Sequence, residues 1–400
     1  MPEIESYLNY FERDLEDAQE EVYQLIVRYQ CQLSEKFAKD ALAKTRYRST
    51  NEIYTFGITR AAFTEGELMK FNLRLQNFRF EERRKFDRAP DDYPPPLRWY
   101  EYLSGQTTGY VLVESKFGPY SNVCGKEAEN DSENLRSAYC LVRLFQAANG
   151  DEYRNRFNVL SCRGFVQLDN RSILLFWNPP SPITNLSPPY FITLREVIGD
   201  EAFGAPMRSK VAKRLVRTVY ELLQARWYHR SICLNNVIAF DPEWKTTYLV
   251  GFGTARLSLD GHSDPASRGR FIWKSRYFQH PDRYVRDKPS DCRFRMKHDI
   301  YGLGVLLLEL QKGVHLGRIS FEKELGKLDG SEVRSHFVEL ACERNQCRLG
   351  EEFILPIVSC LQGFEEHDVG VDVTCHPRVL REFRRVVYNS IFEVQEDSVL

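Results

Sequence analysis

Apolar residues near the start of the chain recur at alternating spacings of three and four. The first stripe is Leu8, Phe11, Leu15, Ala18, Val22, Leu25 and Tyr29, and the second is Leu68, Phe71, Leu75 and Phe78. Each spacing places its apolar residues on one side of an α-helix, and that side must pack against another surface. The second stripe follows TEGE at 64–67, which has the form of a helix-capping box. We therefore predict a helical hairpin or bundle over residues 1–90.

Two interpretations of this helical segment stay open. Either the hairpin packs against the rest of the chain, or it is an effector or oligomerisation segment that binds a protein partner or another copy. The segment ends at RAPDDYPPPLRW, residues 88–99, whose prolines no helix or central strand tolerates. We place a proline-rich linker at 91–97 and a domain boundary there.

Beyond the prolines, the pattern changes to that of strands followed by helices. Residues 108–118 alternate as a strand does, and 159–180 predict two short strands around the turn LDNRS. Residues 132–148 carry a helical apolar face between them, and the remainder of the chain is almost wholly helical, as at 207–229 and 297–313. This order predicts an α+β fold in which a small sheet lobe precedes a larger helical lobe.

The composition is that of a globular chain and argues against nucleic acid as a partner. The 400 residues are 42% apolar, enough for one large or two moderate cores, and 55 basic against 56 acidic residues give a formal net charge of −1. No global basic field therefore attracts nucleic acid. The acidic start lacks an apolar signal region, and no run approaches the roughly 18 apolar residues of a membrane span. We expect no nucleic-acid partner and no transmembrane segment.

The ten cysteines give no sign of a metal site or a disulfide framework. They never form a C-x-x-C pair, and the closest two, Cys342 and Cys347, have no second ligand pair at metal-site spacing. We interpret them as the reduced thiols of a cytoplasmic protein, since disulfides are rare in that compartment.

Four segments resemble the motifs of a protein kinase, in the order of that family. They are the catalytic-loop segment HRSICLNNV at 229–237, the strand pair leading into GFGTAR at 251–256, RYFQHPDRY at 276–284 in place of A-P-E, and DIYGLGVLLLEL opening at Asp299. The resemblance covers roughly residues 98–385. It implies a bilobal protein-kinase-like fold at 98–390, with an N-lobe at about 98–185 and a C-lobe at about 186–390, preceded by the N-terminal helical segment.

The residues that would carry the chemistry of a kinase are replaced. Kinase loops are written H-R-D-L-x-x-x-N, followed by D-F-G. Ser231 stands at the catalytic aspartate, and a serine hydroxyl can neither accept the substrate proton at neutral pH nor orient it by charge. Cys233 replaces the loop lysine, and Gly251 has no side chain to hold magnesium. Asn236 remains as a metal ligand, and one amide oxygen without a carboxylate is a weak site for magnesium.

The nucleotide-binding residues are also incomplete. A kinase glycine-rich loop is G-x-G-x-x-G-x-V, whereas YLSGQTTGYVLV contains only Gly105 and Gly109, which also suit an ordinary hairpin turn. The kinase pattern V-A-I-K places Glu114 at the lysine position, with Lys116 two residues later on the same strand face. Lys116 is either a nucleotide contact or a structural surface residue. We keep Lys116, Gly105 and Gly109 as candidate nucleotide ligands.

The residues that match the family are architectural. By resemblance, His229 and Arg230 tie the loop to its surroundings, Phe252 joins the two lobes beside Gly253, and Asp299 anchors the loop backbone. His280 and Pro281 close the segment at 254–281, where the resemblance implies that Arg230 pairs with a phosphate. A retained scaffold with deleted acids is the profile of a pseudokinase. The nearest alternative acids, Asp241 and Glu243, lie in a strand-connecting turn and are expected to point away.

A wider resemblance is to kinase-like proteins of filamentous fungi, which often follow a helical HeLo-type domain acting in cell death or signalling. It rests on the YLVGF segment and on HP in place of A-P-E. The first function that we weigh is a non-catalytic signalling switch or scaffold that requires no cofactor. The alternative is a divergent protein kinase that retains ATP binding and slow Ser/Thr phosphotransfer. ATP binding stays open in both cases, and we expect no magnesium.

The first apolar stripe generates a test at Leu15, which lies near its centre. A glutamate there would place a charge on the side of the helix that must be covered. We expect Leu15→Glu either to unfold the N-terminal helices or to dissociate an oligomer, as measured by circular dichroism and sedimentation velocity. Unchanged profiles in both measurements would show that the stripe packs against no other surface.

Overall fold

The computed structural model describes the parts of the chain from which the fold can be built. These are residues 78–79, 98–104, 107–117, 138, 140–142, 144–145, 157–167, 172–180, 190–225, 227–257, 279–281, 294–316, 328–344, 347–363, 379–380, 382–389 and 391. The stripe at 8–29, the linker at 91–97 and Gly105 lie outside these residues. Within them the fold is α+β, with antiparallel sheets and a set of helices.

A five-stranded antiparallel sheet forms the first part. Its strands are β1 (Phe78–Arg79), β2 (Arg98–Ser104), β3 (Thr107–Phe117), β4 (Ser161–Gln167) and β5 (Ser172–Asn178), in the order β1-β2-β3-β5-β4. β2 and β3 form a hairpin in which Gly109 lies opposite Tyr102. The expected strands at 108–118 and 159–180 are confirmed.

One expectation about the helical segment is wrong. Phe78, which we assigned to the second helical stripe, lies in β1 and pairs with Tyr102 of β2. A three-to-four spacing over few apolar residues does not exclude a strand, because backbone pairing with an existing sheet edge competes with the helix. The sheet therefore begins before the proline-rich segment.

One face of the sheet contributes to the apolar core. Leu112 of β3, Leu175 and Trp177 of β5 and Phe165 of β4 are almost fully buried. The helix expected at 132–148 is present at residues 138, 140–142 and 144–145, which are also buried, and the ring of Phe145 meets that of Trp177 at 5.3 Å. Burying each of these side chains stabilises the fold by roughly 1.5–3 kcal/mol.

The second part is helical. It contains α6 (Leu194–Val197), α7 (Ala205–Gln224), α8 (Met296–Lys312), α10 (Gly330–Cys342) and α11 (Ile354–Gln362), with short helical turns at Leu234–Asn236, Phe252–Thr254, Glu351–Phe353 and Arg384–Asn389. α8 is buried on nearly all sides, polar residues such as Asp299 and Glu309 included, and ends at Gly313 in the left-handed conformation. Gly304 of α8 permits a close approach of α11, because a Cβ at this position would lie 2.8 Å from the Cβ of Cys360.

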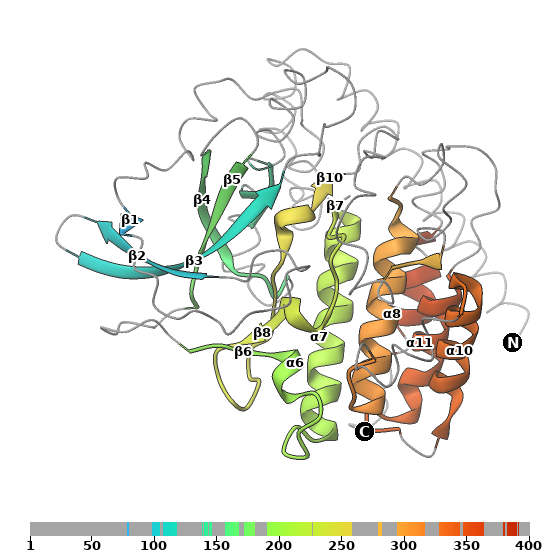
Figure 1. The fold of residues 1–400 in the computed structure, drawn as a ribbon. Coiled ribbons are helices and arrows are strands. Elements are labelled where there is room, and N and C mark those ends of the chain that lie inside the picture. Colours follow the sequence, from blue (N-terminus) through green and yellow to red (C-terminus); the bar gives the residue numbers. More distant parts are fainter. Residues whose placement is uncertain are drawn as a thin grey trace, which may run out of the picture.

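Short strands connect the helices to the sheet region. β6 (Ile192–Thr193), β8 (Val237–Ala239) and β9 (Tyr248–Leu249) form one small sheet, and β7 (Trp227–Tyr228) pairs with β10 (Arg256–Leu257). We expected the long helix to continue to residue 229, but α7 ends at Gln224 because Trp227 and Tyr228 bond to β10 instead. In Figure 1 the five-stranded sheet lies on the left, α8, α10 and α11 lie on the right, and α7 lies between them.

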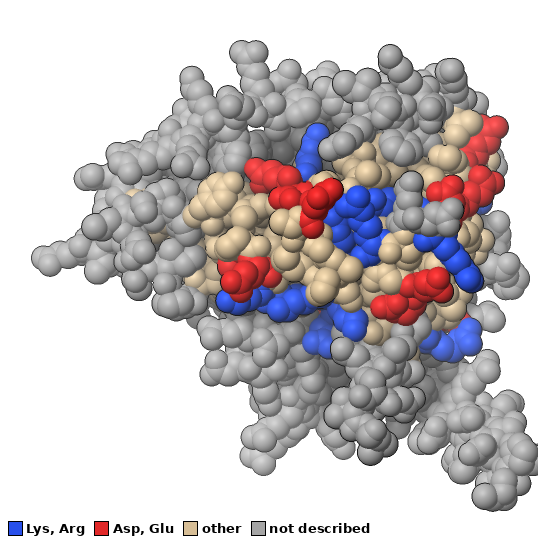
Figure 2. Space-filling model, turned by 90° about the horizontal axis from the view of Figure 1, so that it is seen from below, with Lys and Arg blue, Asp and Glu red and all other residues tan. Residues whose placement is uncertain are grey.

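The described surface carries charges of both signs. Figure 2 shows Lys and Arg groups beside Asp and Glu groups over the coloured part of the face seen from below. The mixture agrees with the formal net charge of −1 for the full chain. No helix among the described residues is long and apolar enough to cross a bilayer.

Candidate functional site

The loop after β7 is fixed to α8 through its backbone. The buried carboxylate of Asp299, in the first turn of α8, accepts hydrogen bonds from the backbone N–H of His229 at 2.6 Å and of Arg230 at 2.8 Å. These bonds hold Arg230 at a φ of 68°, a conformation that few residues other than glycine adopt. Burial raises the pKa of Asp299 to about 7, and the two N–H donors oppose that shift. Asp299 thus fixes the course of the loop.

His229 is a neutral structural brace. Its Nδ1 accepts the backbone N–H of Ser231 at 3.2 Å, so the proton is on Nε2, which donates to the carbonyl of Val250 at 2.9 Å. Burial lowers the pKa of His229 to about 3, because the charged ring would lose its hydration. The imidazole therefore joins the loop to the segment after β9.

Phe252 connects the sheet region to the loop. Its ring meets Phe145 at 4.5 Å, His229 at 4.6 Å and Trp177 at 5.6 Å, the first two in edge-on geometry. Such aromatic pairs contribute about 0.5–1.5 kcal/mol each beyond the area that they bury. Phe252 thus contacts three parts of the structure, namely the helical residues around Phe145, the loop at His229 and strand β5.

Ser231, Asn236 and Gly251 form a closed group. The side-chain amide of Asn236 donates to the carbonyl oxygen of Ser231 at 2.6 Å and to its Oγ at 2.9 Å. Gly251 has a φ of 90°, and a Cβ there would lie 2.6 Å from Oδ1 of Asn236 and closer still to its Cγ. The site therefore has no space for a carboxylate at position 251 unless Asn236 moves.

Glu114 is the residue whose role the sequence did not reveal. Its side chain on β3 is 6% exposed, and its carboxylate accepts hydrogen bonds from the backbone N–H of Gly251 at 3.2 Å and of Gly253. A glutamate at an inward position of an alternating strand was the available signal, since charged residues are almost never buried without partners. At this position of β3 the structure therefore has a carboxylate that binds the backbone of Gly251 and Gly253.

The candidate nucleotide ligands Gly109 and Lys116 both lie in β3. The backbone of Lys116 pairs with Ile173 of β5, and its side chain lies outside what is described. Gly109 lies in the β2–β3 hairpin, opposite Tyr102. Cys233 is buried and precedes the 3₁₀ turn at Leu234–Asn236. Of these residues, with Gly251 and Asn236, none offers a carboxylate.

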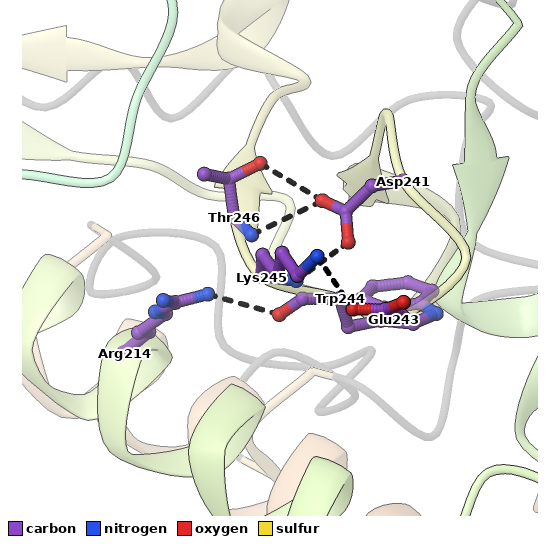
Figure 3. Close-up of polar contacts among 6 residues, drawn as sticks. All are labelled: Arg214, Asp241, Glu243, Trp244, Lys245 and Thr246. Carbon is purple, nitrogen blue, oxygen red and sulfur yellow. Dashed lines mark hydrogen bonds and ion pairs between the residues drawn. The ribbon is translucent and has the colours of Figure 1, made fainter.

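The nearest alternative acids stabilise their own turn. Figure 3 shows Asp241 accepting hydrogen bonds from the backbone and hydroxyl of Thr246 and from the backbone of Lys245, at 2.7–3.2 Å. Glu243 pairs with the Lys245 ammonium at 2.6 Å, and both side chains are exposed. Arg214 of α7 donates to the carbonyl of the buried Trp244 in the same turn. Both acids are thus engaged within the turn itself.

The HP motif and Arg230 meet the start of α8. His280 and Pro281 are buried, and the His280 ring contacts those of His298 and Tyr301 at 5.3 Å. The guanidinium of Arg230 lies over Phe294, 5.1 Å from the ring centroid. Residues 258–278, most of the segment in which we expected a phosphate to pair with Arg230, lie outside the described residues.

Comparison with known proteins does not assign the chain to a family. No protein-family model matches it, and no curated protein matches it. Over the described residues, no three His, Cys, Asp or Glu side chains gather where they could hold a metal ion.

The packing around Gly251 generates a mutational test. We expect Gly251→Ala to lower the free energy of unfolding by about 2–4 kcal/mol. The added Cβ is sterically unfavourable in the left-handed conformation, and it overlaps the side chain of Asn236. Denaturant titration measures the loss. Adding Asn236→Ala should recover part of it, because truncating the amide removes the overlap.

Gly363 is a matched control for the effect of backbone conformation alone. It also has a positive φ, 79°, but a Cβ there would meet no atom within 4 Å. Gly363→Ala should cost less than Gly251→Ala, and Asn236→Ala should not offset it. Equal costs, with no recovery in the double variant, would contradict the overlap.

The raised pKa of Asp299 generates a pH test. The pKa of the Asp299 carboxyl is about 7 in the folded state, against 3.8 for an ordinary aspartate, so the folded state binds its proton more tightly. This contribution to stability is full below pH 3.8 and is lost as the pH rises through about 7. We therefore expect the stability advantage of the wild type over Asp299→Asn to fall between pH 4 and 7 and to level off above pH 7, as measured by denaturant unfolding.

Asp329 provides the control of opposite sign. It caps α10 by accepting from the backbone of Ser331 and Glu332, and these bonds lower its pKa. The advantage of the wild type over Asp329→Asn should therefore be lost only at acidic pH. A pH-independent difference between wild type and Asp299→Asn would show that Asp299 titrates alike in both states.

Proposed function

We propose that this chain contains a catalytically impaired protein-kinase-like domain, a pseudokinase, that acts as a signalling switch or scaffold. The antiparallel sheet followed by a helical part supports a bilobal arrangement, with lobes at about 98–185 and 186–390. The contacts of Asp299, His229 and Phe252 support it further, because they occupy the positions that the motif resemblance gives them. The scaffold of the loop is kept while its acids are missing.

The observation that carries the proposal is the closed group of Ser231, Asn236 and Gly251. Phosphoryl transfer depends on metal ligands and on a carboxylate near the attacking hydroxyl. Here the NH₂ group of Asn236 bonds to Ser231, which leaves its Oδ1 as the one oxygen that could bind a metal, and a side chain at position 251 would overlap the amide unless Asn236 moves. With no carboxylate at position 231 or 251, a single amide oxygen is a weak metal site, which favours loss of metal-dependent catalysis.

The signalling role rests on the predicted N-terminal helices and on the wider resemblance. A domain without phosphotransfer acts through its surfaces, and the predicted helices at 1–90 are a candidate segment for binding a protein partner or another copy. The wider resemblance to fungal kinase-like proteins with HeLo-type domains points the same way, toward a cytoplasmic signalling protein. Phosphorylation within 254–281 would be one regulatory signal, with the phosphate group bound by Arg230.

A nucleotide thermal-shift experiment tests the impaired chemistry. We expect that adding Mg²⁺ or Mn²⁺ to ATP or ADP does not increase any shift of the unfolding temperature, because no carboxylate at positions 231 or 251 completes a metal site. Asn236→Ala should behave as the wild type does in this comparison of metal-free and metal-containing samples.

Two results would favour the divergent kinase instead. One is a metal-dependent gain in nucleotide affinity that Asn236→Ala removes. The other is incorporation of phosphate into protein above background, with Mg²⁺ or Mn²⁺, that Lys116→Ala abolishes. Either result would end the proposal of a non-catalytic domain.

A further inference from the structure

The backbone at Gly251–Gly253 has the geometry of an anion-binding nest. Gly251 is left-handed, with φ 90° and ψ 35°, and Phe252 begins a 3₁₀ turn. In a nest, N–H groups of residues close in sequence converge on one anionic group. The N–H groups of Gly251 and Gly253 converge in this way on the Glu114 carboxylate, which lies 137 residues earlier than Gly251 in the chain.

This contact joins two parts of the structure that meet at Phe252. Glu114 belongs to β3, whose backbone pairs with β5 at Leu175. Gly251 and Gly253 flank Phe252, which packs on Trp177 of β5. The carboxylate therefore adds a polar bond beside an aromatic one, and both cross from the sheet to the segment after β9.

The contact also determines which ligands this place accepts. The two N–H groups bond to the carboxylate, so an incoming phosphate group would have to displace it. A buried carboxylate would in addition repel a phosphate at short range, because charges are poorly screened there. The backbone at Gly251–Gly253 binds an anion, and the Glu114 carboxylate of the same chain is that anion.

We propose that Glu114 is a built-in ligand that holds the Gly251–Gly253 nest against β3 without any bound nucleotide. The inference deepens the proposed function and rests on it for its meaning. A non-catalytic domain of this kind keeps the sheet and the loop region together in its ligand-free state. Opening this latch, defined as the Glu114–Gly251–Gly253 contact, would expose an anion-binding site.

Hydrogen exchange in the full chain tests the latch. We compare the peptide that covers residues 251–257 in wild type, Glu114→Gln and Glu243→Gln. Glu114→Gln keeps the shape but replaces one acceptor oxygen by an NH₂ group, so exchange at Gly251 and Gly253 should become at least roughly tenfold faster, as for loss of a charge-assisted bond. Glu243→Gln removes an exposed carboxylate in another turn and should leave this peptide unchanged. Equal rates in wild type and Glu114→Gln would overturn the proposal.

Rescue by a small carboxylate gives a second readout. In Glu114→Ala the nest loses its anion, so acetate should slow exchange of the same peptide more than chloride does at equal ionic strength. Wild type should show no such difference, because its own carboxylate fills the nest. Equal effects of acetate and chloride in Glu114→Ala would show that the nest selects no anion, and if this variant fails to fold, Glu114→Gln in acetate carries the same comparison.

The two proposals can fail separately. Adding ATP with and without Mg²⁺ to the wild type tests the proposed function, because metal-dependent protection of the 251–257 peptide would show a working metal–nucleotide site. The Glu114→Gln comparison is made without nucleotide and reports the latch alone. A normal Glu114→Gln exchange rate together with no nucleotide effect would remove the latch and leave the pseudokinase proposal standing.

Discussion

The bond between the Asp299 carboxylate and the backbone of His229 and Arg230 is the constraint on which the site depends. α8 is buried on nearly every side and gives this carboxylate a fixed position. From there the order extends outward, because the His229 ring bonds to Val250 and packs on Phe252, which reaches Trp177 in the sheet. A chain of short contacts thus links the centre of the helical part to β5.

Much of this arrangement could be predicted because it is local. The alternation of β3, the apolar faces of α7 and α8, and the spacing of the loop motif all follow from residues close together in sequence. The Glu114 contact could not be predicted, because spacing does not show which of two candidate strand residues meets a turn 137 positions later. The strand at Phe78 was missed for a similar reason, since its pairing partner lies beyond the proline-rich segment.

The site also shows how two neighbouring positions constrain each other. Gly251 adopts a left-handed backbone, and the side chain of Asn236 lies where a Cβ at position 251 would be. Asn236 in turn bonds to Ser231 through its NH₂ group. A carboxylate introduced at position 251 would therefore displace Asn236 and disturb its bond to Ser231.

The close approach of α8 and α11 at Gly304 has a consequence for thiol chemistry. Cys360 is fully buried against Gly304, and burial raises the pKa of its thiol, so the reactive thiolate is suppressed there. Cys342, at the end of α10, is exposed. An alkylating reagent therefore reaches Cys342 in the native state and Cys360 only after the two helices separate. The rate at which Cys360 is alkylated therefore reports the separation of α8 and α11, and Cys342 in the same helical part is the exposed reference thiol.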